Sequence, residues 1–131
     1  MLSAAQKDLF DAQGYLVVEN VFDQDTILEA VRIEYCELLN QLIAGWIDQG
    51  LIPKKARELD FFAQLAACYD AGCDWFQPMD ISLPGDRITA DTPMHFGPAV
   101  FDLLTALKLL DIVESLIGPE ITSNPIQTKI F

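Results

Sequence analysis

The stretch that decides the fold class is residues 21–50, VFDQDTILEAVRIEYCELLNQLIAGWIDQG. Asp23 stands where a carboxylate caps a first helical turn, and Gly50 stands where a left-handed residue ends a helix. Apolar residues recur between them at steps of three and four, the spacing of one helix face; they are Leu28, Val31, Tyr35, Leu38, Leu42 and Trp46. The stretch predicts a long amphipathic helix whose stripe packs into a core.

The residues before this helix predict a short helix and a strand. Ser3 and Gln6 have the spacing of a capping box, in which each residue satisfies the other's backbone amide. The helix should run to about Gln13, with Gly14 as its left-handed end. Residues 15–20, YLVVEN, are aromatic and β-branched and too few for a helix, so they predict a strand.

A second long helix is predicted after residue 50, followed by a long loop. The helix should run from about Lys54 to Ala71 and end at Gly72, with an apolar face formed by Leu59, Phe62, Leu65, Ala66 and Tyr69. Residues 73–97 contain three prolines and little periodicity, which predicts an ordered loop. Loops of this length inside compact domains are often functional.

The last third of the chain predicts more helix and then a strand. Pro98 suits a first helical residue. The helical pattern that follows predicts either one bent helix or two helices with a break near Asp111, and Gly118 with Pro119 ends it. Apolar and polar residues then alternate, which places the start of a strand near residues 120–131.

Composition predicts one globular domain over residues 1–131. The chain is 51% hydrophobic and 21% charged, which favours a packed core over disorder. Its formal net charge of -12 would repel phosphate backbones and anionic lipid headgroups, so neither nucleic acid nor membrane is an expected partner. The three cysteines predict reduced thiols, and the first residues show no targeting leader, so a cytoplasmic location is expected.

Few residues suggest chemistry by themselves. Cys68 and Cys73 lack the second Cys or His pair that a zinc site needs, and we expect two semi-buried thiols near a helix end. His95 is the only histidine, and no serine lies in a nucleophile elbow. The spacing of the residues therefore predicts no metal site and no nucleophilic site.

Two segments carry a family resemblance. GYLVVENVFD (residues 14–23) and the later segment that runs from FGPAVFDLL to LLDIVESLIGPEITSNPIQ (residues 96–127) resemble the N-terminal part of the phytanoyl-CoA dioxygenase family. The resemblance implies a non-haem Fe(II), 2-oxoglutarate-dependent oxygenase that hydroxylates a small organic molecule. The implied fold is mainly α with a few short strands. It is the helical front of a double-stranded β-helix, or jelly-roll, in an incomplete domain whose first sheet strand lies near residues 120–131.

The iron ligands of that family are not found in this chain. The family holds iron with a His-x-Asp pair and a distal histidine, a facial triad that leaves coordination positions for 2-oxoglutarate and oxygen. Here His95 is the single histidine, and Phe96 and Gly97 follow it. The resemblance therefore implies ligands beyond residue 131. The chain alone should be inactive and should bind neither Fe(II) nor 2-oxoglutarate tightly.

The resemblance implies two cofactor-binding residues. Counted from the Gly-Pro landmark, Gln127 falls where the family has a cofactor-facing side chain, and its amide could donate to a 2-oxoglutarate carboxylate. A polar residue at a strand edge is the alternative. A further contact of the family lies in the region of Arg87, Thr92 and His95. His95 could line the pocket as a hydrogen-bond donor, or could be a loop histidine satisfied by backbone.

One other class of function fits the sequence. Helices of this length could bury much of their own apolar surface, which would make the chain an independent acidic module that binds a partner protein through one helix face. The oxygenase interpretation instead expects a small-molecule substrate.

Overall fold

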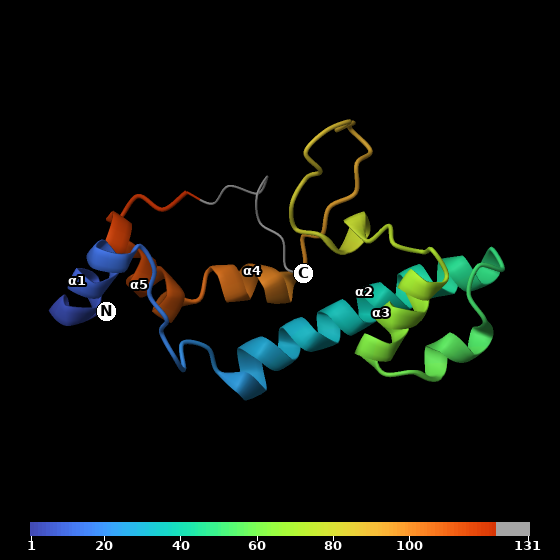
Figure 1. Cartoon of the computed structure of the whole chain (residues 1–131), viewed down its shortest axis with the longest axis horizontal. Coiled ribbons are helices and arrows are strands. Elements are labelled where there is room, and N and C mark those ends of the chain that lie inside the picture. Colours follow the sequence, from blue (N-terminus) through green and yellow to red (C-terminus); the bar gives the residue numbers. More distant parts are fainter. Residues whose placement is uncertain (123–131) are drawn as a thin grey trace. The chain divides into compact units, whose positions relative to one another are not determined.

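The computed structural model describes residues 1–122, and helices are its regular elements (Figure 1). The α-helices are α1 (Ala4–Gln13), α2 (Glu29–Asp48), α3 (Phe61–Asp70), α4 (Pro98–Leu104) and α5 (Leu107–Ile117); the shorter ones are the π-helix η1 (Gln24–Leu28) and the 3₁₀-helices η2 (Lys54–Glu58) and η3 (Gln77–Met79). The mainly α prediction is confirmed for this part of the chain.

The strand predicted over residues 15–20 is wrong. These residues form no regular structure, and the side chains of Tyr15 and Val17 are 62% and 76% exposed. β-propensity describes how well a side chain fits a pleated, half-buried surface, and within residues 1–122 there is no sheet to provide that surface. The strand predicted near residues 120–131 falls almost wholly outside the described residues.

The described residues divide into two compact units. One contains residues 1–31 and 98–122, and the other contains residues 32–97. The prediction of a single incomplete domain over residues 1–131 stays a prediction.

Helix α1 begins and ends as its sequence predicts. The side chain of Ser3 accepts a hydrogen bond from the Gln6 amide at 3.3 Å, and the Gln6 side chain accepts one from the Ser3 amide at 2.9 Å. Gly14 follows the helix in the left-handed region, at φ 78°. The capping box and the glycine stop are both confirmed.

The start of the long helical segment is fixed by Asp23. Its Oδ1 accepts hydrogen bonds from the amides of Asp25 and Thr26, at 3.1 and 2.9 Å, and from the Thr26 hydroxyl at 2.8 Å. These bonds, the Thr26 hydroxyl first among them, lower the pKa of Asp23. The cap leads into η1 and then α2, and Gly50 closes the segment at φ 75°. The predicted cap and stop are confirmed.

The buried row of α2 is displaced from the predicted stripe. The row recurs at steps of four and consists of Tyr35, Leu39, Ile43 and Ile47. Of the predicted stripe within α2, Tyr35 is buried, whereas Leu38, Leu42 and Trp46 are only half-buried. The apolar surface of α2 is wider than one row, so its sequence pattern allows several neighbouring rows to face the core.

The second long helix of the prediction is in fact two elements. Helix η2 ends at Glu58, Leu59 is extended, and α3 begins after Asp60. The Asp60 side chain caps α3 by accepting a hydrogen bond from the Ala63 amide at 2.9 Å. Aspartate is among the best N-caps, so a new helix begins where a continuous one was predicted.

The face of α3 that was predicted to be buried is largely exposed. Phe62 is 78% exposed and Tyr69 is 61% exposed. The buried residues of α3 are Gln64 and Cys68, and the side-chain amide of Gln64 donates to the Asn40 side chain at 3.1 Å. The helix therefore directs its small and polar side inward, contrary to the prediction from hydrophobic spacing.

The final helical segment is two helices, and the break lies before Asp111. Pro98 opens α4, as predicted. The Thr105 hydroxyl donates to the Phe101 carbonyl at 2.8 Å, and Ala106 leaves the helical conformation at ψ 124°. A break at residues 105–106 replaces the predicted break near Asp111. Gly118, at φ 89°, ends α5 as predicted.

The two units have cores of different size. In residues 32–97 the most deeply buried side chains include Leu39, Ile43, Cys68, Met79 and Ser82. In the described part of the other unit, the buried apolar side chains are those of Leu2 and Val100. Within residues 1–122, none of the helices has both the length and the apolar character required to cross a bilayer.

Candidate functional site around His95

The loop between η3 and α4 is held in shape by its own polar side chains. The side-chain amide of Gln77 donates to the carbonyls of Ser82 and Pro93, at 2.7 and 3.3 Å, and so joins the outgoing and returning arms of the loop. The Asp80 side chain accepts from the amide and the hydroxyl of Ser82, at 3.0 and 2.8 Å. The His95 amide donates to the Asp80 carbonyl at 2.8 Å. The loop is ordered, as predicted.

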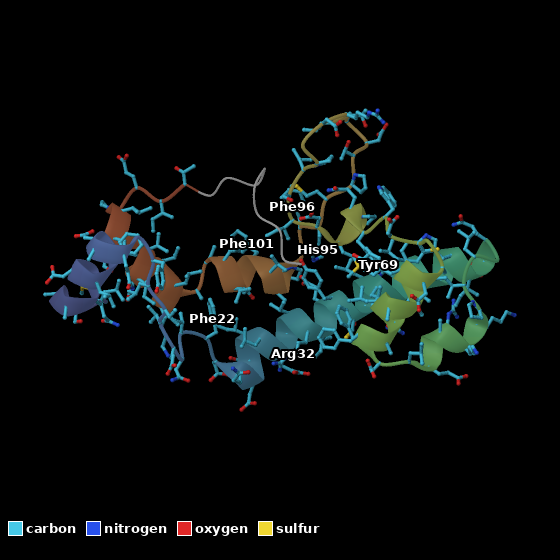
Figure 2. All side chains as sticks on the ribbon, in the orientation of Figure 1. Phe22, Arg32, Tyr69, His95, Phe96 and Phe101 are labelled. Atoms are coloured by element: carbon cyan, nitrogen blue, oxygen red, sulfur yellow. The ribbon has the colours of Figure 1, made fainter. Side chains whose placement is uncertain are left out.

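The His95 side chain ties this loop to α2 (Figure 2). Its Nε2 lies 2.8 Å from Oε1 of Glu34, and the two side chains are 12% and 14% exposed. The ring also meets the Tyr35 ring edge-on, with centroids 5.6 Å apart. In the neutral ring, a carboxylate at Nε2 favours the tautomer that carries its proton on that nitrogen, so that Nε2 donates to Oε1.

The surroundings of His95 are apolar and negative. Burial, together with the smaller effects of the Glu34 and Asp80 charges, raises the pKa of Tyr35 to about 12. A carboxylate ligand that approached His95 would meet the same two acidic groups. The site therefore suits a cation better than an anion.

Gly97 is part of this site because no larger residue fits there. A Cβ atom at this position would overlap the Glu34 carboxyl group and the His95 ring. Gly97 is itself buried. The Glu34–His95 pair therefore packs directly on the backbone at residue 97.

The residues present do not fit the iron centre that the resemblance implies. A facial triad needs two histidines and a carboxylate, and His95 is the only histidine. Within residues 1–122, no three metal-ligating side chains gather into a group that could hold a metal ion. What the arrangement provides is a hydrogen bond between His95 Nε2 and Glu34 Oε1 that joins the loop to α2.

The predicted site residues have different outcomes. Gln127 lies outside the described residues. His95 is bonded through its ring to a side-chain carboxylate, so the alternative of a backbone-satisfied histidine is wrong. The hydroxyl of Thr92 accepts from the Thr89 amide at 2.8 Å, and Arg87 is exposed at φ 56°. The cofactor roles of Gln127 and His95 stay predictions.

Sequence reasoning missed Glu34 and Gly97. Glu34 looks like any acidic residue beside an apolar stripe, and 61 positions separate it from His95. Gly97 looks like a helix-preceding glycine. A lone histidine two residues before a glycine, in a long proline-containing loop, is the signal that could have directed attention to this point.

Comparison of the chain with protein-family models, with curated proteins and with solved structures gave no match.

Proposed function

We propose that this chain is the helical N-terminal part of a non-haem iron, 2-oxoglutarate-dependent oxygenase that resembles the phytanoyl-CoA dioxygenase family. In this proposal the complete protein acts in the cytoplasm on a small organic molecule. Residues 1–131 support a jelly-roll sheet that follows them and that supplies the iron ligands. The resemblance of residues 14–23 and 96–127 suggests the family, and the exposed apolar face of α3 is the observation that carries the proposal.

This face, here called the α3 stripe, consists of Phe62, Ala66 and Tyr69. Phe62 is 78% exposed and Tyr69 is 61% exposed, and the three members follow one another at steps of four and three. Full burial of one large apolar side chain stabilises a protein by roughly 1.5–3 kcal/mol. A contiguous apolar surface of this kind usually marks a place where other protein packs.

A sheet is the occupant that we propose for the α3 stripe. No charged residue lies between Phe62 and Tyr69, so permanent burial of the stripe would leave no charged side chain without water. Helices that cover one face of a sheet are a common way to complete a two-layer domain. The opposite side of α3, with Gln64 and Cys68, is already buried within residues 32–97.

The Glu34–His95 pair has a supporting role in this proposal. It fixes the loop over residues 80–97 against α2, so that the loop has a defined position before any ligand binds. His95 then acts as a positioning residue at the edge of the pocket. Its ring is hydrogen-bonded to Glu34, and no chemical step is assigned to it.

Dye binding tests whether the α3 stripe is an uncovered packing surface. We expect residues 1–131 to bind the hydrophobic dye ANS and to self-associate. The double variant Phe62→Ser/Tyr69→Ser should lose most of both signals. The matched control is Ile88→Ser/Phe96→Ser, which removes two exposed apolar side chains, 50% and 84% exposed, from the loop. Equal losses in the two variants would contradict the proposal.

Thermal unfolding separates the proposal from the acidic interaction module. A self-contained module should melt sharply as a monomer and should bind no dye. That result would contradict the oxygenase proposal. Incubation of residues 1–131 with Fe(II) and 2-oxoglutarate should yield no succinate, and tight iron binding by these residues alone would also contradict it.

A further inference from the structure

Helix α5 has an exposed face with a different composition from the α3 stripe. Leu107, Asp111, Glu114 and Ile117 follow one another at steps of four, three and three, which places them on one side of the helix. All four are exposed, with Leu107 at 79% and Ile117 at 63%. The face, here called the α5 face, spans about 15 Å along the helix axis. Along the helix its four side chains are, in order, apolar, acidic, acidic and apolar.

The two carboxylates make the α5 face unsuitable for a covering sheet. Burial of Asp111 and Glu114 under an apolar layer would leave two like charges without water. The α3 stripe has no such charges. A partner that covered the α5 face would therefore have to bring positive charge together with apolar surface.

The surrounding unit favours a basic partner. Residues 1–31 and 98–122 contain ten acidic residues and two lysines, Lys7 and Lys108. A field of one sign raises the rate at which oppositely charged partners associate and disfavours partners of the same sign. This unit also has a small core, which leaves much of the apolar surface of α5 near solvent: no residue of α5 is buried.

We propose that the α5 face docks a basic amphipathic helix of a partner protein. Apolar side chains of the partner pack on Leu107 and Ile117, and two Lys or Arg side chains between them pair with Asp111 and Glu114. Amphipathic helices are commonly recognised through such anchors at helical spacing. This interaction is independent of the sheet proposed for the α3 stripe.

The test uses a synthetic amphipathic peptide of about 18 residues, long enough to form a helix, built from Leu, Ala and Lys and labelled for fluorescence anisotropy. A second peptide carries Glu in place of every Lys. We expect residues 1–131 to bind the Lys peptide, less tightly as salt rises, and not to bind the Glu peptide. The variant Asp111→Lys/Glu114→Lys should weaken Lys-peptide binding about tenfold and should gain binding of the Glu peptide.

The control variant is Asp86→Lys/Asp91→Lys, which changes the net charge by the same amount on the exposed loop. It should leave binding of the Lys peptide within about twofold. A third variant, Leu107→Ser/Ile117→Ser, keeps all charges and should also weaken binding about tenfold. Equal weakening by the two charge variants, no effect of the Ser variant, or no binding of the Lys peptide would each overturn the proposal.

Discussion

Only a glycine fits at residue 97, because the side chains of Glu34 and His95 pack against its backbone. The imidazole and the carboxyl group occupy the space where a side chain at residue 97 would begin. Their hydrogen bond joins the loop to α2. The packing at this point, and not backbone freedom, explains the glycine.

Substitution of Gly97 tests this contact. Gly97→Ala should lower the free energy of unfolding by about 1–3 kcal/mol, because the added methyl group must displace Glu34 or His95. The matched control is Gly85→Ala, where a Cβ atom meets nothing within 4 Å. Its effect should stay below about 1 kcal/mol. Chemical denaturation measures both, and equal effects of the two substitutions would contradict this packing.

Tyr35 should make stability depend on pH in the alkaline range. Its pKa is raised from 10.0 in the unfolded chain to about 12 in the folded one. Below pH 10 the Tyr35 hydroxyl keeps its proton in both the folded and the unfolded chain, and the contribution of Tyr35 to stability is fully present. Between pH 10 and about 12 the unfolded state loses the proton first, so the free energy of unfolding falls.

The variant Tyr35→Phe removes this titration. Its free energy of unfolding should fall less steeply than that of the wild-type chain as pH rises from 10 towards 12. Urea denaturation at several pH values gives both slopes, and since all other titrating groups are shared, their difference reports Tyr35. Identical slopes would show that Tyr35 titrates alike in both states.

Among the elements, α2 shows most directly how helix orientation can be tested. Leu39 is completely buried, whereas Leu42, a member of the predicted stripe, is half-buried. Leu39→Ala should therefore lower the free energy of unfolding by about 2–5 kcal/mol, and Leu42→Ala by roughly half as much. Denaturation curves of the two variants decide the orientation. A larger decrease in the free energy of unfolding for Leu42→Ala than for Leu39→Ala would favour the predicted stripe instead.

Several ends of the elements were predictable from the sequence, whereas the orientations of α2 and α3 were not. Ser3, Gly14, Asp23 and Gly50 act through hydrogen bonds or dihedral angles that involve only near neighbours, so the sequence pattern reveals them. The Asp60 cap also depends only on near neighbours, but the predicted continuous helix did not include it. The orientation of α3 depends on what covers each side, which its own periodicity cannot reveal.

The site was less predictable than the helices. His95 was selected as a candidate, but its partner Glu34 comes from a distant helix, and Gln127 lies beyond the described residues. Spacing along the chain could indicate neither the pair nor the packing at Gly97.

For the whole molecule, the unequal cores predict unequal local stability. The unit of residues 32–97 contains most of the fully buried apolar side chains, whereas the other described unit contributes Leu2 and Val100. Amides of α5 should therefore exchange with deuterium faster than those of α2. Hydrogen exchange followed by mass spectrometry measures both helices in one sample. Equal protection of α2 and α5 would contradict this difference.

Succinate formation tests the central claim most directly. The polypeptide extended by the coding sequence downstream of codon 131 should convert 2-oxoglutarate to succinate in an Fe(II)-dependent reaction, while residues 1–131 should form none. A reading frame that stops at codon 131, an extended chain that forms no succinate, or succinate from the 131 residues alone would contradict the account.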